Sequence, residues 1–182
     1  MMNENKYLLK NGKELIVRSL TEDDAEAMIS LMKMADTETR FLSREIGEFN
    51  YSAEQEKEVI LARGKDANAF WIVGEVDGKI VANCDTSGVS GKQRYRHRAE
   101  IAIVVLKEYW GLGIGKILMS QSIAWCKNKN FEQLELGVLS GNQRAMALYK
   151  SLGFENFGIK KNAIKYQDGS YADEHIMWLS LK

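Results

Sequence analysis

The chain has 182 residues, with 25 basic and 25 acidic side chains and a formal net charge of zero at pH 7. This balance gives no overall positive field, so we expect no nucleic-acid or membrane partner, and any anion must be bound locally. The length suits one domain with a substantial buried core, and we predict a single domain over residues 1–182.

The first part of the chain predicts a strand and two helices. Thr21 can cap the first helix, and Ser52 with Gln55 three residues later forms a capping box for the second. Between the two helices lies a long loop. The expected elements are a strand over residues 15–20, a helix to about Met34, a loop over 35–51 and a helix from 52 to about Gly64.

The remainder predicts strands interleaved with two helices. Asp77 and Gly78 suit the tight turn of a hairpin, and Gly153 suits the left-handed end of a helix. No repeat or linker divides the chain, so we expect a mixed sheet flanked by helices. The expected strands are 70–76, 79–85, 99–106, 131–138, 157–166 and 175–181, and the expected helices are 115–129 and 142–152.

Three glycines alternate between a predicted strand and a predicted helix. Gly111, Gly113 and Gly115 directly follow the apolar residues 99–106 and begin a helix. A helix N-terminus carries unpaired N–H groups and a partial positive charge, and glycines let a phosphate approach closely. The pattern favours a phosphate-binding turn over a simple chain reversal, with Lys116 as a local cation.

Two common phosphate loops do not match this turn. The dinucleotide pattern that starts at Gly111 needs glycine where Lys116 stands. The mononucleotide loop needs glycine at Trp110 and a hydroxyl residue at Ile117. The residues at these positions therefore exclude both phosphate-binding motifs.

The residues around the turn resemble a known family. Residues 99–115, AEIAIVVLKEYWGLGIG, resemble motif A of the GNAT superfamily of N-acetyltransferases, and residues 141–154, GNQRAMALYKSLGF, are similar to its motif B. The order of elements matches over nearly the whole chain. Trp110 departs from the pattern, because it stands where the family most often has Arg or Gln. Backbone amides supply most of the anion binding at such a turn, so the departure affects only a side-chain contribution.

This resemblance implies a mixed α/β fold of the GNAT type, with a mostly antiparallel, splayed sheet of about seven strands and about four flanking helices. In such proteins acetyl-CoA is the cosubstrate. Its pantetheine arm enters the gap beside the strand ending near Val105 and pairs with backbone, and no metal is needed. The residues expected to bind acetyl-CoA are Val104, Val105, Leu106, Trp110, Gly111, Leu112, Gly113, Ile114, Gly115, Lys116, Asn142 and Tyr149.

The resemblance also suggests catalytic residues. Tyr149 occupies the position of the family's usual general acid, and a phenol can give a proton to the leaving thiolate; core packing is the alternative. Glu100 lies on the strand before the turn, where some members carry a base, although pairing with Arg96 or Arg98 explains it equally well. Asp85 and Glu38 are weaker candidates for the base. Asn142 suits a helix cap, a cofactor contact or both.

We therefore expect an enzyme that transfers the acetyl group directly to a primary amine of a small molecule or peptide. A non-catalytic acyl-CoA sensor and a peptide N-terminal acetyltransferase are the alternatives. The loop over residues 35–51 falls where the family builds its acceptor site. Carboxylates there would favour a cationic amine, and arginines the carboxylate of an amino acid. The family is also compatible with a homodimer.

The cellular compartment is predicted from the cysteines and from the absence of targeting and membrane-spanning segments. Cys84 and Cys126 have no further Cys or His at ligand spacing, which indicates reduced, buried thiols and no metal site. Residues 1–13 have no apolar core of a signal peptide, and no stretch has the length of a membrane span. We expect a cytoplasmic protein.

Overall fold

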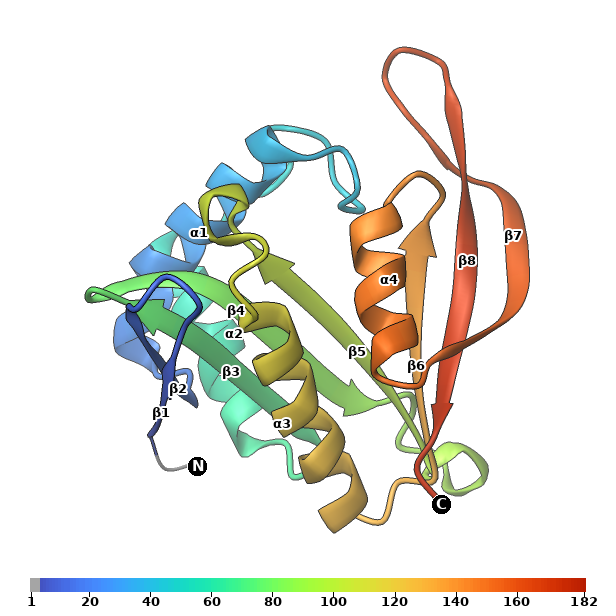
Figure 1. The fold of residues 1–182 in the computed structure, drawn as a ribbon, viewed down its shortest axis with the longest axis horizontal. Coiled ribbons are helices and arrows are strands. Elements are labelled where there is room, and N and C mark those ends of the chain that lie inside the picture. Colours follow the sequence, from blue (N-terminus) through green and yellow to red (C-terminus); the bar gives the residue numbers. More distant parts are fainter. Residues whose placement is uncertain (1–3) are drawn as a thin grey trace.

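The computed structural model describes residues 4–182 as an eight-stranded mixed sheet with four α-helices (Figure 1). The strands are β1 (Asn5–Leu8), β2 (Glu14–Ser19), β3 (Ala69–Val76), β4 (Lys79–Gly88), β5 (Arg98–Val105), β6 (Gln133–Leu139), β7 (Glu155–Lys165) and β8 (Tyr171–Ser180). The helices are α1 (Ala25–Glu38), α2 (Ala53–Lys65), α3 (Ile114–Asn128) and α4 (Gln143–Ser151), with short 3-10 turns at η1 (Glu22–Asp24), η2 (Gln93–Tyr95) and η3 (Lys107–Tyr109). None of these helices is both long and apolar enough to cross a membrane.

Local sequence signals explain where several elements begin and turn. Ser52 accepts a hydrogen bond from the backbone N–H of Gln55 at 3.2 Å, and the Gln55 side chain accepts one from the N–H of Ser52 at 2.9 Å. This reciprocal capping box begins α2 as expected. Asp77 and Gly78 both have positive φ, 52° and 77°, which is the backbone of a tight hairpin turn between β3 and β4.

Helices cover both faces of the sheet. Ile72 and Val73 are neighbours on β3, so their side chains point to opposite faces, and both are fully buried. Figure 1 shows α3 in front of β3 to β5 and α2 behind them. The apolar core on the two sides therefore fixes the plane of the sheet and the position of its strand ends.

The sheet divides between β5 and β6. Its order is β1-β2-β3-β4-β5-β6-β8-β7, and every neighbouring pair is antiparallel except β5 with β6. That parallel pair extends only from Arg98 to Glu100, opposite Gln133 to Glu135. Beyond Glu100 the two strands separate, as Figure 1 shows. The splayed, mostly antiparallel sheet expected from the resemblance is confirmed.

Two details differ from the prediction. The sheet has eight strands because Asn5–Leu8 pairs with β2 through its backbone, and this polar segment carries no apolar alternation that could have signalled it. Helix α1 continues one turn past Met34 to Glu38. That turn is held by tertiary packing, since Ala35 and Asp36 are buried. The loop before α2 therefore covers residues 39–52 and is called the acceptor loop below.

An ion pair joins the two halves of the sheet where they still touch. Arg98 Nε and Nη2 donate to the two carboxylate oxygens of Glu135 at 2.5 and 2.6 Å, and Gln133 adds a third hydrogen bond at 2.6 Å. These hydrogen bonds, the one from Arg98 first, lower the pKa of Glu135 despite its burial. The pair thus links β5 to β6 next to the point of separation.

We expect Arg98→Met to lower the free energy of unfolding at neutral pH by about 1–3 kcal/mol, because Glu135 would be buried without its cation. The folded-state pKa of Glu135 is lowered, so the pair stabilises the protein above the carboxyl's ordinary pKa and loses that effect as the pH falls through the lowered value. Urea unfolding at several pH values measures this difference. Arg94→Met, at an exposed position, is the matched control; equal stability of the two variants would contradict the assignment.

Candidate active site

The turn before α3 has the backbone of an anion site. Gly111 and Gly113 have φ of 81° and 99°, a region that glycine enters without strain. Within residues 4–182, no backbone carbonyl accepts from the N–H groups of residues 111–116. These N–H groups stand at the N-terminus of a 15-residue helix, where the helix dipole also favours an anion. The sequence assigned this role to the same glycines.

Gly115 is needed for a different reason. Its φ is ordinary, but a Cβ at this position would lie 3.0 Å from Cδ2 of Leu148 on α4. The missing side chain therefore lets α3 and α4 approach each other closely beside the turn.

Trp110 and Arg144 form a unit beside the glycines. The indole Nε1 donates to the carbonyl oxygen of Val105 at 2.7 Å, and the guanidinium carbon of Arg144 lies 5.1 Å from the ring centroid. Arg144 Nη1 is also 3.9 Å from the position a Cβ on Gly111 would take. A cation from α4 thus stands next to the turn, where the tryptophan replaces the more usual Arg or Gln.

A cavity of about 750 Å³ follows the opening between β5 and β6. It extends from the glycine turn along Val104 and Val105 to α1, α2 and β4. Beyond Glu100 the β6-facing edge of β5 has no strand partner, so an extended chain can pair with its backbone there. The cavity can hold a long, thin molecule with an anionic end at the glycines.

Helix α4 brings two predicted residues to this cavity. Asn142 lines it and caps the helix, since its Oδ1 accepts from the N–H of Ala145 at 3.2 Å. Tyr149 lies two turns further on the same side, 8% exposed, and lines the cavity too. Burial raises the pKa of Tyr149, so the phenol stays protonated and can donate a proton.

Most of the predicted acetyl-CoA contacts line this cavity, and three predicted residues do not. Leu106 is buried in the core with its N–H bonded to Val81, and Leu112 packs against the same core. Glu100 is exposed and lines a second cavity of about 430 Å³ instead. The lining residues are Val104, Val105, Trp110, Gly111, Gly113, Ile114, Gly115, Lys116, Asn142 and Tyr149.

The end of the cavity away from the glycines contains three groups that the sequence did not single out as site residues, together with Asp85, a weaker candidate for the base. Glu56 of α2 and Trp71 of β3 line it, with Asn83 and Asp85 of β4. A signal for Glu56 existed, because it precedes Ile60 by one helical turn and so shares the buried face of α2.

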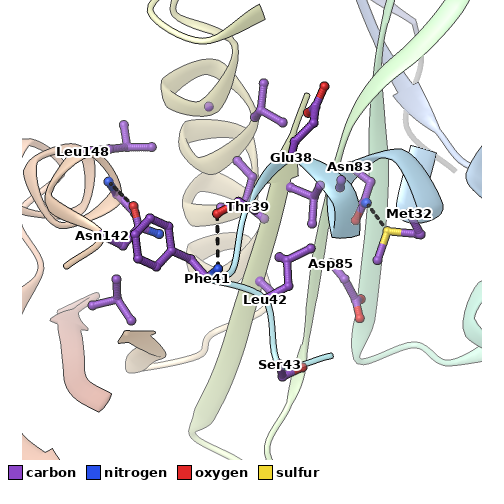
Figure 2. A pocket seen from close by; sticks show the side chains of 18 of the residues that line it. Met32, Glu38, Thr39, Phe41, Leu42, Ser43, Asn83, Asp85, Asn142 and Leu148 are labelled. Carbon is purple, nitrogen blue, oxygen red and sulfur yellow. Dashed lines mark hydrogen bonds between the residues drawn. The ribbon is translucent and has the colours of Figure 1, made fainter. Parts of the chain in front are cut away.

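The acceptor loop is held over this end by contacts from distant parts of the chain. Phe41 lies between Thr39 and Asn142 in Figure 2, and Arg40 pairs with Asp168 in the turn between β7 and β8 at 3.3 Å. At the end of α1, Glu38 Oε2 accepts from the N–H of Lys107 at 2.7 Å. The loop is thus connected to the C-terminal hairpin, and the end of α1 from which it starts is connected to the segment before the glycine turn.

Comparisons with known proteins agree with this geometry. The model of the acetyltransferase (GNAT) family matches residues 31–154. A Bacillus subtilis (strain 168) protein described as a candidate alanine N-acetyltransferase of ribosomal protein bS18 is 32% identical over 114 residues, covering 62% of this chain and 70% of that protein.

Solved structures show the same fold. The GNAT-family acetyltransferase from Streptococcus pneumoniae superposes with a TM-score of 0.86 at 24% identity, covering 91% of this chain and 99% of that one. A GNAT phosphinothricin acetyltransferase from Sinorhizobium meliloti, solved with acetyl-CoA, gives a TM-score of 0.80 at 19% identity, covering 96% and 89%. With its splayed sheet, its glycine turn and these matches, the chain belongs to the GNAT acetyltransferase family.

Proposed function

We propose that this chain is an acetyl-CoA-dependent N-acetyltransferase that transfers the acetyl group directly to a primary amine of a small molecule or peptide in a ternary complex. One observation carries the proposal. A single cavity connects the anion-binding N–H groups before α3 to the phenol of Tyr149 and continues beyond it to the acceptor loop. Both substrates can therefore be bound at once, with the transferred group between them.

Acetyl-CoA fits the first part of the cavity. The N–H groups of residues 111–116 would bind the pyrophosphate, with Lys116 and Arg144 as nearby cations. The pantetheine arm would follow the open edge of β5 at Val104 and Val105. The Sinorhizobium meliloti structure, which holds acetyl-CoA in the same fold, supports this choice of donor.

The transfer needs one new bond and one proton at the leaving group. The neutral amine attacks the thioester carbonyl, the C–S bond breaks, and Tyr149 gives its proton to the departing thiolate. The amine's own proton passes to a base or to solvent. Glu100 stays a hypothesis for that base; it lies in the smaller cavity, which shares Asp85 and Ile101 with the larger one.

A release assay for free CoA with a panel of amines tests this function. We expect CoA release that depends on both acetyl-CoA and an amine, and an acetylated product of the added mass. If acetyl-CoA binds but no amine in the panel releases CoA, the chain is a non-catalytic sensor. Stabilisation by ATP or NAD rather than by CoA would contradict acetyl-CoA binding itself.

We further propose that the protein acts in the cytoplasm. Cys84 and Cys126 are both free and buried, and burial raises the pKa of each thiol to about 12. Such thiols are inert packing groups, which fits a reducing compartment.

A further inference from the structure

The part of the cavity under the acceptor loop is acidic. Two carboxylates reach it from different elements, Glu56 from the first turn of α2 and Asp85 from β4. Figure 2 shows Asp85 on the side of the cavity that also carries Asn83 and Met32, opposite Asn142 and Leu148 of the α4 region. The acidic end therefore lies across the cavity from α4.

Glu56 is buried without a partner. It is 2% exposed, and within residues 4–182 its carboxyl group makes no hydrogen bond and no ion pair. Burial alone accounts for the raised pKa of this carboxyl. A carboxylate in such a place is costly unless something in the cavity compensates it.

Asp85 lines the same end of the cavity but is ion-paired with Arg63. Its Oδ2 accepts from Arg63 of α2, whereas its Oδ1 is buried and has no hydrogen-bond partner. Within residues 4–182, Glu56 is thus the carboxylate at this end whose charge has no partner, whereas the charge of Asp85 is compensated by Arg63.

The arginines of the acceptor loop are already engaged. Arg44 lines the cavity but donates to the buried Asp36 at 2.8 Å, and its guanidinium lies 5.2 Å from the ring of Phe49. Arg40 pairs with Asp168 and stacks on Tyr166 at 3.8 Å. Both guanidinium charges are therefore already compensated by carboxylates, which weakens the reason to favour an amino-acid acceptor.

The side chains that line the cavity together with the carboxylates suit an alkyl chain. The Trp71 indole N–H lies at the limit of hydrogen bonding from Asn83 Oδ1, at 3.5 Å, and the Asn83 amide donates to Met32 Sδ at 3.4 Å. Trp71 and Met32 therefore line this end of the cavity with largely apolar side chains. Such surfaces accept methylene groups and also the face-on approach of an ammonium.

We propose that this end of the cavity selects an alkyl diamine or polyamine, with Glu56 binding the ammonium distal to the one that is acetylated. This inference rests on the proposed acetyl transfer and names its acceptor class. Glu56 is then a specificity-determining residue rather than a catalytic one: it compensates the second positive charge, and the entering ammonium compensates its buried carboxylate.

Three amines that differ only in the terminal group opposite the acetylated amine test this proposal with the wild-type protein. These are 1,5-diaminopentane, 1-aminopentane and 5-aminopentanoate, compared by kcat/KM in the CoA-release assay. We expect the diamine to exceed 1-aminopentane by about 10- to 100-fold, as for a hydrogen bond to a charged group, and the aminopentanoate to be the poorest. Equal values for all three, or a preference for the aminopentanoate, would overturn the proposal.

The variant Glu56→Gln keeps the shape and removes the charge. We expect it to reduce the ratio of diamine to 1-aminopentane to near one, while the thermal shift caused by acetyl-CoA is retained. Glu58→Gln, on the exposed side of the same helix, is the control and should keep the ratio. An unchanged ratio in Glu56→Gln would contradict the role of Glu56.

Calorimetry separates this inference from the proposed function. If no amine releases CoA, acetyl transfer is wrong, but titration of 1,5-diaminopentane into the CoA-loaded protein still tests the acidic end. Heat of binding that is lost in Glu56→Gln supports the inference, and absence of binding to the wild type overturns it.

Discussion

Replacing Gly113 by glutamate is expected to abolish acetyl-CoA binding, with at least about a hundredfold loss of affinity. Gly113 is the N-cap of α3, and a Cβ at this position would meet no atom within 4 Å, so a side chain would extend into the open space in front of the helix N-terminus. A carboxylate there would occupy the anion site and repel the pyrophosphate. The thermal shift produced by acetyl-CoA, together with direct titration, measures the loss.

Two controls separate this effect from backbone strain. At φ of 99°, any L-residue costs about 1–2 kcal/mol, so Gly113→Glu also lowers stability. Gly78→Glu carries the same kind of strain, since Gly78 has φ of 77° and open space around it, but it lies in the β3–β4 turn. Gly113→Gln keeps the size of the side chain without its charge. We expect acetyl-CoA to stabilise Gly78→Glu fully and Gly113→Gln weakly; normal affinity in Gly113→Glu would remove the turn from the binding site.

The parts of the site predicted from the sequence are those determined by neighbouring residues. The alternating glycines, the capping box at Ser52 and the turn at Asp77 each depend on a few consecutive side chains and their backbone preferences. Helix α4 begins and ends where Asn142 and Gly153 indicate, for the same reason. Because these signals are local, they predict the turns and helix ends correctly, and the structure confirms those positions.

The acceptor end depends on tertiary packing, and its local signal is weaker, namely the one-turn spacing of Glu56 and Ile60 on α2. A glutamate in the first turn of a helix is ordinarily solvent-exposed and favoured by the helix dipole, which makes Glu56 inconspicuous. It is buried because α1 and β3 pack against α2. Arg98 was considered as a partner of Glu100, but it pairs with Glu135 across the β5–β6 junction. That pairing requires the strand order, which no local pattern contains.

The acceptor class could not be predicted from the sequence for the same reason, because it depends on the ion pairs of Arg40 and Arg44. Charge composition of the loop left a cationic amine and an amino acid equally open as acceptors. The choice depends on which charges are already compensated, and Asp36 and Asp168, which pair with the two loop arginines, lie 8 and 128 residues away from them. Contacts of this kind decide the net charge that a substrate meets.

The second large effect is expected for Tyr149→Phe, which should lower kcat by about 100-fold and leave acetyl-CoA affinity unchanged. The ring of Tyr149 is buried beside Phe154, with ring centroids 6.0 Å apart, and phenylalanine keeps that packing while removing only the proton donor. Tyr95→Phe, at an exposed tyrosine on η2, is the control and should behave as wild type. Steady-state kinetics with a saturating amine distinguishes the two variants, and an unchanged kcat in Tyr149→Phe would eliminate the acid assignment.

The pH profile gives an independent check on the same residue. A general acid acts only while protonated, and burial raises the pKa of Tyr149 above its ordinary value of 10.0. The loss of activity from its deprotonation therefore moves to higher pH than for a free phenol. We expect wild-type kcat to rise as the amine loses its proton and then to stay level to about pH 10. A decline of kcat that begins near pH 8, and is absent from Tyr149→Phe, would show that the phenol titrates too early to serve as this buried acid.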